Sequence, residues 1–184
     1  MRVIAGSARR MQLSSPKGEK TRPTQDIIKE TLFNIIQFDV PGSVFLDLCA
    51  GSGSIGIEAL SRGAAKAYFA ENDKEACKCI QDNLRRTHLD DRGVLLKMDV
   101  QNALLHIHEK HYDIIYLDPP YESDVIAAVL SQLASHPAVD EDTVIIAETG
   151  LDTDMSFIET LGFCVVREKN YHSQRHLFIS RRGQ

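Results

Sequence analysis

The sequence predicts an α/β fold in which seven strands form a mostly parallel sheet, helices cover both faces and the last two strands pair antiparallel. After residue 42, short apolar runs alternate with longer segments of helical spacing, as in repeated βαβ units. No helical segment separates the last two apolar runs, and so short a connection joins antiparallel strands. The length of 184 residues suits one ordinary domain, because such a chain buries roughly two thirds of its unfolded surface.

The first 23 residues are expected to form a small extension, and residues 24–184 the main domain. Two short strands, at residues 2–5 and 11–13, flank a turn that contains glycine and serine. This pattern predicts a β-hairpin, which a polar loop follows.

The main domain is expected to begin with an amphipathic helix, because isoleucines and leucines recur at helical spacing from Thr24 and stop before Pro41. Thr24 follows Pro23 and is a suitable N-cap. Continuous apolar runs such as residues 114–117 suit strands that are covered on both faces. We expect strands near residues 43–48, 66–71, 93–98, 112–117, 142–148, 162–168 and 175–181. We expect further helices near residues 53–62, 73–86, 100–109, 122–134 and 153–161.

Composition argues against membrane, secreted and metal-binding classes. The chain is 43% hydrophobic and 26% charged, which is typical of globular proteins. No apolar run approaches the roughly 20 residues that span a bilayer, and the N-terminal residues lack the pattern of a signal peptide. The four cysteines have neither disulfide-framework nor zinc-site spacing. We therefore expect a cytoplasmic protein with no metal and no membrane contact.

Charge is distributed unevenly along the chain, whose net charge is -5. Residues 1–38 hold seven Lys/Arg and three Asp/Glu, and residues 167–184 hold five and one, so both ends are basic. A polyanion would be attracted to these ends, because local potential governs contact. The alternative is solvated surface charge that happens to cluster. Candidate phosphate contacts are Arg2, Arg9, Arg10, Arg22 and Arg175.

A glycine loop follows the first buried strand, where Gly51, Gly53 and Gly56 match G-x-G-x-x-G. In dinucleotide-binding enzymes this motif places backbone amides against a pyrophosphate. Asp47 precedes the loop at the strand end, and its charge would repel phosphates. A ligand with an ammonium group and no phosphate suits the loop better, and S-adenosylmethionine is such a ligand.

Acidic residues also end the next two predicted strands. Glu71 would accept from both ribose hydroxyls, and Asp99 from the adenine amino group. The carboxyl ends of parallel strands border one crevice, so Asp47, Glu71 and Asp99 should lie together. The alternative is that each acid only caps the helix that follows it.

A tetrapeptide, Asp118-Pro119-Pro120-Tyr121, ends the fourth predicted strand. Two prolines require the strand to stop in a rigid turn. The exocyclic amine of a nucleobase is a poor nucleophile, and the Asp118 carboxylate with the Pro119 carbonyl could accept its hydrogens. Tyr121 offers a face on which an extruded base can stack. Methyl transfer of this kind needs alignment but no metal.

These motifs resemble those of class I S-adenosylmethionine-dependent amino-methyltransferases, whose fold is Rossmann-like. Nearly the whole chain is similar to the bacterial 16S ribosomal RNA guanine-N2 methyltransferases of the RsmD type. The segments that carry this resemblance are residues 2–6, 22–26, 30–34, 47–56, 58–64, 71–73 and 118–121.

The resemblance implies rRNA methylation at the N2 amine of a guanine, as in 16S rRNA (guanine(966)-N(2))-methyltransferases. The partner would be the RNA or an assembling small ribosomal subunit. The cofactor product would be S-adenosylhomocysteine, and the protein would be a monomer. By position, the cofactor-binding residues would be Arg22, Thr24, Asp47, Gly51, Gly53, Glu71, Asn72 and Asp99. The guanine would meet Asp118, Pro119, Pro120 and Tyr121. The chain departs from the family pattern at Ile27 and Lys29 and at Arg9-Arg10-Met11. These departures concern the expected contacts with RNA.

Three other functions remain open from the residues. A DNA adenine-N6 or cytosine-N4 methyltransferase shares the tetrapeptide, although 184 residues leave little room for a domain that recognises DNA sequence. A nicotinamide-dependent oxidoreductase could use the glycine loop with Glu71. An RNA-binding assembly factor could retain an inactive fold. His172 and His176 are interpreted as surface histidines, with RNA contact as the alternative.

Overall fold

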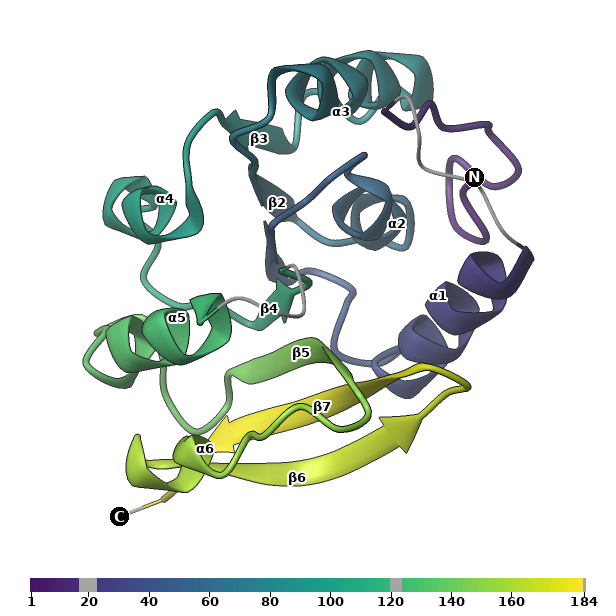
Figure 1. Ribbon diagram of the computed structural model, residues 1–184. Helices are drawn as coiled ribbons and strands as arrows, with labels where there is room; N and C mark the ends of the chain where they lie inside the picture. Colours follow the sequence, from purple (N-terminus) through teal and green to yellow (C-terminus); the bar gives the residue numbers. More distant parts are fainter. Residues whose placement is uncertain (17–22, 120–123, 184) are drawn as a thin grey trace.

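The computed structural model describes residues 1–16, 23–119 and 124–183. Figure 1 shows a central sheet with helices on either side. The strands are β1 (Val44–Leu48), β2 (Lys66–Ala70), β3 (Gly93–Leu96), β4 (Ile114–Leu117), β5 (Val144–Gly150), β6 (Phe163–Asn170) and β7 (Gln174–Arg181). The helices are α1 (Pro23–Ile35), α2 (Ser54–Ser61), α3 (Lys74–Thr87), α4 (Val100–His106), α5 (Val125–Ala134) and α6 (Phe157–Thr160).

The seven strands form one sheet in the order β3-β2-β1-β4-β5-β7-β6. The first five run parallel, whereas β7 is antiparallel to both β5 and β6. The predicted fold class is therefore confirmed. The order of strands reverses between β1 and β4, and ligands of open α/β sheets bind outside the carboxyl ends of the strands at such a point.

Two apolar cores lie on opposite faces of the sheet. One contains Leu32 of α1, Ile57 of α2 and Ile80 of α3, together with Phe45 and Phe69 from the strands. The other packs helices α4, α5 and α6 against the second face. Because β1 and β4 are buried on both faces, their apolar sequences are continuous rather than alternating, as predicted.

The N-terminal segment, residues 1–16, packs against α1, α2 and α3. Val3, Ala8 and Leu13 are buried in the same core as these helices. The close approach to α2 requires glycine at position 6, where a Cβ would lie 1.8 Å from the Ser61 carbonyl oxygen. Glycine also tolerates the φ of +83° found there.

The predicted N-terminal hairpin contains an antiparallel bridge between Arg2 and Gln12, and the amides of Val3 and Leu13 donate across it to the carbonyls of Met11 and Met1. The amides of residues 4 and 5 donate instead to the Glu58 side chain. Helix α1 is also shorter than predicted. It ends at Ile35, and the amide of Val40 closes a turn onto the carbonyl of Ile36. Ile36 and Val40 are nevertheless buried, so the apolar pattern continues while the backbone does not.

Within the described part of the chain, no helix has the length and apolar character needed to cross a membrane. Across the same residues, no group of three or more His, Cys, Asp or Glu side chains could hold a metal ion.

Candidate functional site

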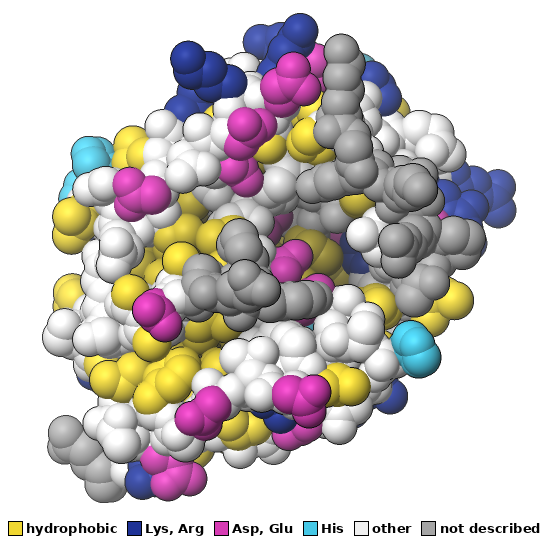
Figure 2. All heavy atoms as spheres, in the orientation of Figure 1, with side chains coloured by type: hydrophobic (Ala, Val, Ile, Leu, Met, Phe, Trp, Pro, Cys, Tyr) yellow, Lys and Arg dark blue, Asp and Glu magenta, His cyan; other side chains and the backbone are white. Residues whose placement is uncertain are grey.

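A cavity of about 890 Å³ lies at the carboxyl ends of β1, β2, β4 and β5. Figure 2 shows the hollow near the centre of the view, with carboxylates around it and many of the Lys and Arg side chains toward the upper and right margins. Helix α1 forms part of the wall through Gln25, Ile28, Lys29 and Leu32. The predicted site residues that line the cavity are Asp47, Gly51, Glu71, Asn72, Asp99, Asp118 and Pro119.

The glycine loop between β1 and α2 depends on glycine at each motif position. Gly51 and Gly53 have φ values of +55° and +76°, which L side chains rarely adopt. A Cβ on Gly56 would lie 2.4 Å from Cε1 of Phe69, so the third glycine allows α2 to pack closely on β2. The loop therefore turns sharply and brings the start of α2 to the cavity.

Asp47 is 2% exposed, at the end of β1. Its Oδ2 accepts a hydrogen bond of 2.8 Å from the Gly56 amide, so the carboxylate also supports the glycine loop. Burial raises the pKa of Asp47 to about 7, and the nearby Glu71 charge adds to this effect. A cation bound in the cavity would favour the ionised form.

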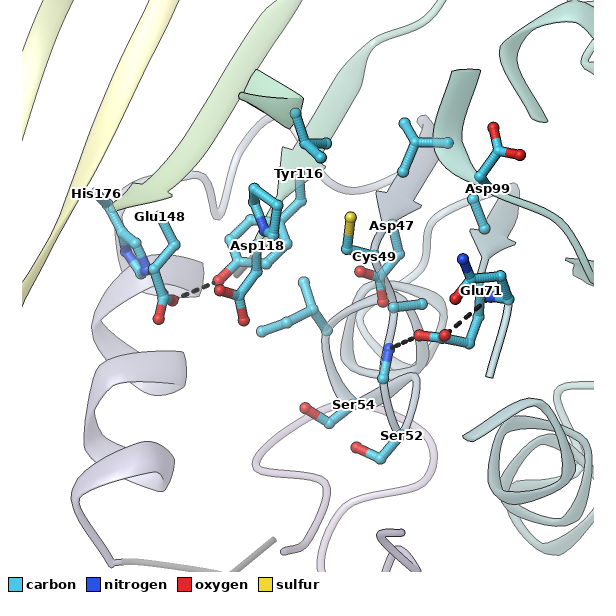
Figure 3. A pocket seen from close by; sticks show the side chains of 18 of the residues that line it. Asp47, Cys49, Ser52, Ser54, Glu71, Asp99, Tyr116, Asp118, Glu148 and His176 are labelled. Atoms are coloured by element: carbon cyan, nitrogen blue, oxygen red, sulfur yellow. Dashed lines mark hydrogen bonds and ion pairs between the residues drawn. The ribbon is translucent and has the colours of Figure 1, made fainter. Parts of the chain in front are cut away.

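Glu71 follows β2 and organises the opposite side of the loop. Its Oε2 accepts from the Gly51 amide at 2.8 Å, and its Oε1 accepts from the amides of Asn72 and Asp73 at 2.8 Å each. The side chain thus connects the glycine loop with the start of α3. Glu71 lines the cavity (Figure 3), where its carboxylate could accept from a ligand's hydroxyl groups.

Asp99 combines the two interpretations that the sequence left open. It is the N-cap of α4, because its Oδ1 accepts from the Asn102 amide at 3.0 Å, and this bond lowers its pKa. It also lines the cavity. Capping and ligand contact are therefore compatible at this position.

Asp118 and Pro119 directly follow β4 and border the same cavity (Figure 3). Asp118 is exposed, whereas Pro119 is buried. Pro120 and Tyr121, the rest of the predicted tetrapeptide, lie outside the described residues, as does Arg22. Thr24 lies in the first turn of α1, and its side chain is not among those described.

Cys49 stands in the glycine loop and lines the cavity. Burial and the charges of the surrounding carboxylates Asp118, Glu71 and Asp47 together raise the pKa of its thiol to about 12. The thiol therefore stays protonated near neutral pH and is a weak nucleophile.

One part of the cavity was not predicted from the sequence: the group formed by the buried residues Tyr116, Glu148 and His176 and the half-buried Gln174. The Tyr116 hydroxyl donates to Glu148 Oε2 at 2.7 Å, and His176 Nε2 lies 2.9 Å from the same oxygen. The interpretation of His176 as a surface residue is wrong, because its side chain is 0% exposed. Glu148 shows the same signal as Asp47, an acid at a strand's carboxyl end, and could have been found by it.

The predicted RNA-contacting arginines differ in exposure and in their partners. Arg9 and Arg10 are exposed on the N-terminal segment. Arg2 is exposed and pairs with Asp26 at 3.1 Å. Arg175 is mostly enclosed, since its guanidinium donates to the Thr153 carbonyl and to the Thr149 hydroxyl.

The charge of the cavity fits a cationic ligand. Among the described lining residues, one is a lysine or arginine, Lys29. Its ammonium group donates to the Arg2 carbonyl at 2.8 Å, and burial lowers its pKa. The lining carboxylates are Asp47, Glu71, Asp99, Asp118, Asp124 and Glu148. This excess of acid over base suits a sulfonium or ammonium ligand and opposes a pyrophosphate.

Residues 1–180 match the model of the family described as Conserved hypothetical protein 95. The putative rRNA methyltransferase YlbH of Bacillus subtilis is 37% identical over 172 residues, which are 92% of each chain. Ribosomal RNA small subunit methyltransferase D of Haemophilus influenzae is 32% identical over 171 residues, 92% of this chain and 88% of that protein. The solved structure of the putative methyltransferase yhhF from Escherichia coli has a TM-score of 0.81 at 26% identity, over 100% of this chain and 99% of that one. These findings confirm the resemblance stated from the motifs.

Proposed function

We propose that this chain, which belongs to the family described as Conserved hypothetical protein 95, uses S-adenosylmethionine to methylate the N2 amine of a guanine in small-subunit ribosomal RNA. One observation carries the proposal: Asp118 stands at the end of β4 in the same acidic cavity as the glycine loop. A carboxylate there can hold an amine beside a bound cation. The names of the relatives support rRNA as the substrate.

The described residues fit this cofactor. Glu71 and Asn72 would contact the ribose, Asp99 the adenine amino group, and Asp47 the positive charge through the ionised form of its carboxylate. Gly51 lines the cavity and would keep the loop free of a side chain where the cofactor approaches the backbone, whereas a Cβ on Gly53 would meet Ile80 and Phe69 of the core. Bound S-adenosylmethionine supplies an electrophilic methyl group on a positively charged sulfur.

Asp118 acts on the nucleophile. The lone pair of the guanine amine is delocalised into the ring, and positive charge develops on this nitrogen as it forms a new bond. The Asp118 carboxylate accepts a hydrogen bond from the amine and stabilises that charge. The Pro119 carbonyl is the second acceptor, and Tyr121 stacks on the base.

The RNA is held by the basic ends of the chain. Arg9 and Arg10 are exposed on the N-terminal segment, whose first residue, Met1, lines the cavity. Contacts from Arg2, Arg22 and Arg175 would complete this surface. We also propose that the protein works as a monomer in the cytoplasm, on free rRNA or on an assembling small subunit.

The test is transfer of tritium from labelled S-adenosylmethionine to small-subunit rRNA taken from a strain that lacks this protein, followed by nucleoside analysis. Wild type should yield N2-methylguanosine. Asp118→Asn should lower the rate about 100- to 1,000-fold, because it removes the charge that stabilises the transition state. Calorimetry should show that this variant still binds S-adenosylmethionine.

Other outcomes would replace the proposal. Methylation of purified DNA without activity on rRNA would assign a DNA methyltransferase. Tight NADH binding without S-adenosylmethionine binding would assign an oxidoreductase. Full activity of Asp118→Asn would remove the catalytic role from this residue.

A further inference from the structure

Glu148 lies beside Asp118 as a consequence of strand register. Tyr116 of β4 is opposite Ile146 of β5. Side chains two positions further along each strand point to the same face, which places Asp118 and Glu148 next to each other. β5 continues to Gly150 whereas β4 ends at Leu117, so Glu148 faces the cavity where Asp118 begins the turn (Figure 3).

Among the described residues, Tyr116, Gln174 and His176 hold the Glu148 carboxylate in place. Tyr116 and His176 both contact Oε2, and the Gln174 amide donates to Oε1. The nearby charge of Glu148 and the burial of Tyr116 raise the pKa of this phenol well above its ordinary value, so it remains a donor. The Tyr171 hydroxyl lies 3.2 Å from His176 Nδ1 and fixes the ring. These hydrogen bonds orient the Glu148 carboxylate, whose oxygens act as acceptors.

An oriented carboxylate acceptor beside Asp118 distinguishes the nucleobases by their hydrogen-bonding edges. Guanine carries a hydrogen on N1, next to the N2 amine. Adenine and cytosine carry an unprotonated ring nitrogen next to their amines, at N1 and N3. An acceptor at this point attracts the guanine edge and repels the lone pair of the other two bases. Each carboxylate oxygen can accept more than one hydrogen bond, so the contacts to Tyr116 and His176 are compatible with a bound base.

We propose that Glu148 accepts the hydrogen on N1 of the target guanine and thereby selects guanine over the other amine-bearing bases. The inference rests on the proposed function and deepens it. Asp118 holds the amine that receives the methyl group, and Glu148 determines which base can present it. Tyr116, Gln174 and His176 are positioning residues, because they act through Glu148.

The experiment compares two substrates that share the reactive amine. The guanosine that acquires label in the rRNA assay is replaced by 2-aminopurine riboside through splinted ligation. 2-Aminopurine keeps the 2-amino group but has no hydrogen on N1. Wild type should methylate guanine about 5- to 150-fold faster than 2-aminopurine, the range expected for one well-placed base contact. Equal rates for wild type would overturn the proposal without any variant.

Glu148→Gln tests the residue itself. Glutamine has nearly the same shape but carries an amide donor, which suits the unprotonated N1 of 2-aminopurine. Its guanine rate should fall, and its ratio of guanine to 2-aminopurine rates should come within about threefold of one, because the charge that repels this nitrogen is gone. A fall in both rates with the ratio preserved would show a structural role only and would overturn the proposal.

Glu109→Gln is the matched control. Glu109 accepts a hydrogen bond of 2.6 Å from the strand tyrosine Tyr68, as Glu148 does from Tyr116, but it is not among the residues that line the cavity. This variant should keep the wild-type ratio. If wild type transfers no label to rRNA, the proposed function fails; if it transfers label but Glu148→Gln keeps the ratio, only the role of Glu148 fails.

Discussion

Asp47 shows how one side chain connects the glycine loop with the charge of the ligand. It is buried at the end of β1, yet among the described residues its one hydrogen bond comes from a backbone amide, that of Gly56. A buried carboxylate with so little compensation is costly when ionised. A bound sulfonium would lower that cost, so the same residue supports the loop and favours a cation.

We predict that Asp47 makes the ligand-free protein less stable as the pH rises. Its pKa is raised from 3.8 to about 7, so between these values the folded state binds more protons than the unfolded state. The corresponding stabilisation is fully present below pH 3.8 and is lost as the pH rises through 7. The loss is on the order of 4 kcal/mol.

The measurement is the free energy of unfolding in urea from pH 4 to pH 8 for wild type and Asp47→Asn. Asparagine keeps an acceptor for the Gly56 amide but carries no charge. The difference between the two proteins should change by about 3 kcal/mol between pH 4 and pH 7. A difference that does not vary with pH would show that the pKa of Asp47 is ordinary.

Glu58 of α2 connects this helix with the N-terminal segment through hydrogen bonds. This carboxylate is 0% exposed and accepts hydrogen bonds from the amides of Ile4 and Ala5 at 2.7 and 3.0 Å. It also pairs with Lys29 of α1 and with Arg62 at the end of α2. The segment that carries Arg9 and Arg10 is therefore fastened to two helices that border the cavity.

A second connection joins the same segment to the glycine loop. The Asn83 side chain of α3 donates to the carbonyls of Ser14 and Ser52, and its Oδ1 accepts from the Ser14 amide. Its exposure is 0%. The predicted RNA-binding segment and the predicted cofactor loop thus share one buried side chain.

Glu58→Gln should weaken both the fold and the attachment of this segment. It leaves Lys29 and Arg62 without their buried counter-charge, and removing one partner of such a group costs about 3 to 5 kcal/mol. Urea unfolding measures the total loss. Hydrogen exchange should show that the Ile4 and Ala5 amides lose more protection than amides of β1.

Glu159→Gln serves as the comparison, because Glu159 pairs with Arg182 on the surface and its side chain is 71% exposed. We expect a change in stability below about 1 kcal/mol there. Equal effects of the two substitutions would contradict the role given to Glu58.

At the scale of the whole molecule, acidic and basic side chains lie in different places. The carboxylates gather in the cavity, whereas Arg9 and Arg10 are exposed outside it. A net charge of -5 disfavours RNA at a distance, so binding depends on local basic contacts. Such contacts release counterions and make affinity depend on salt.

Replacing Arg9 and Arg10 together by serine should reduce the salt dependence of RNA binding. If each arginine contacts one phosphate of single-stranded RNA, the slope of log K against log salt should become less steep by about 1.4. Fluorescence anisotropy with labelled small-subunit rRNA between roughly 50 and 200 mM salt measures this slope. Lys110 is exposed and lies outside the basic ends, so Lys110→Ser should leave the slope unchanged. An unchanged slope in the double variant would show that neither Arg9 nor Arg10 contacts the RNA.

The order of elements and the sheet could be predicted from the sequence because local patterns encode them. Apolar runs such as Ile114–Leu117 indicate buried strands, and helical spacing indicates the covering helices. The strand-end acids Asp47, Glu71, Asp99 and Asp118 could likewise be placed in one crevice, since parallel strands present their carboxyl ends on one side of a sheet. The end of α1 at Ile35 could not, because the apolar pattern continues through Ile36 and Val40 after the backbone has left the helix.

By itself, then, the sequence determined the fold, the glycine loop and the acidic character of the site, which follow from periodicity and from residues close together in the chain. Only the tertiary structure decided that His176 is buried, that Glu148 faces the cavity beside Asp118, and that Asn83 joins Ser14 to Ser52. These contacts join residues that are far apart in sequence. They depend on strand register and on packing between helices, for which a single sequence carries no local pattern.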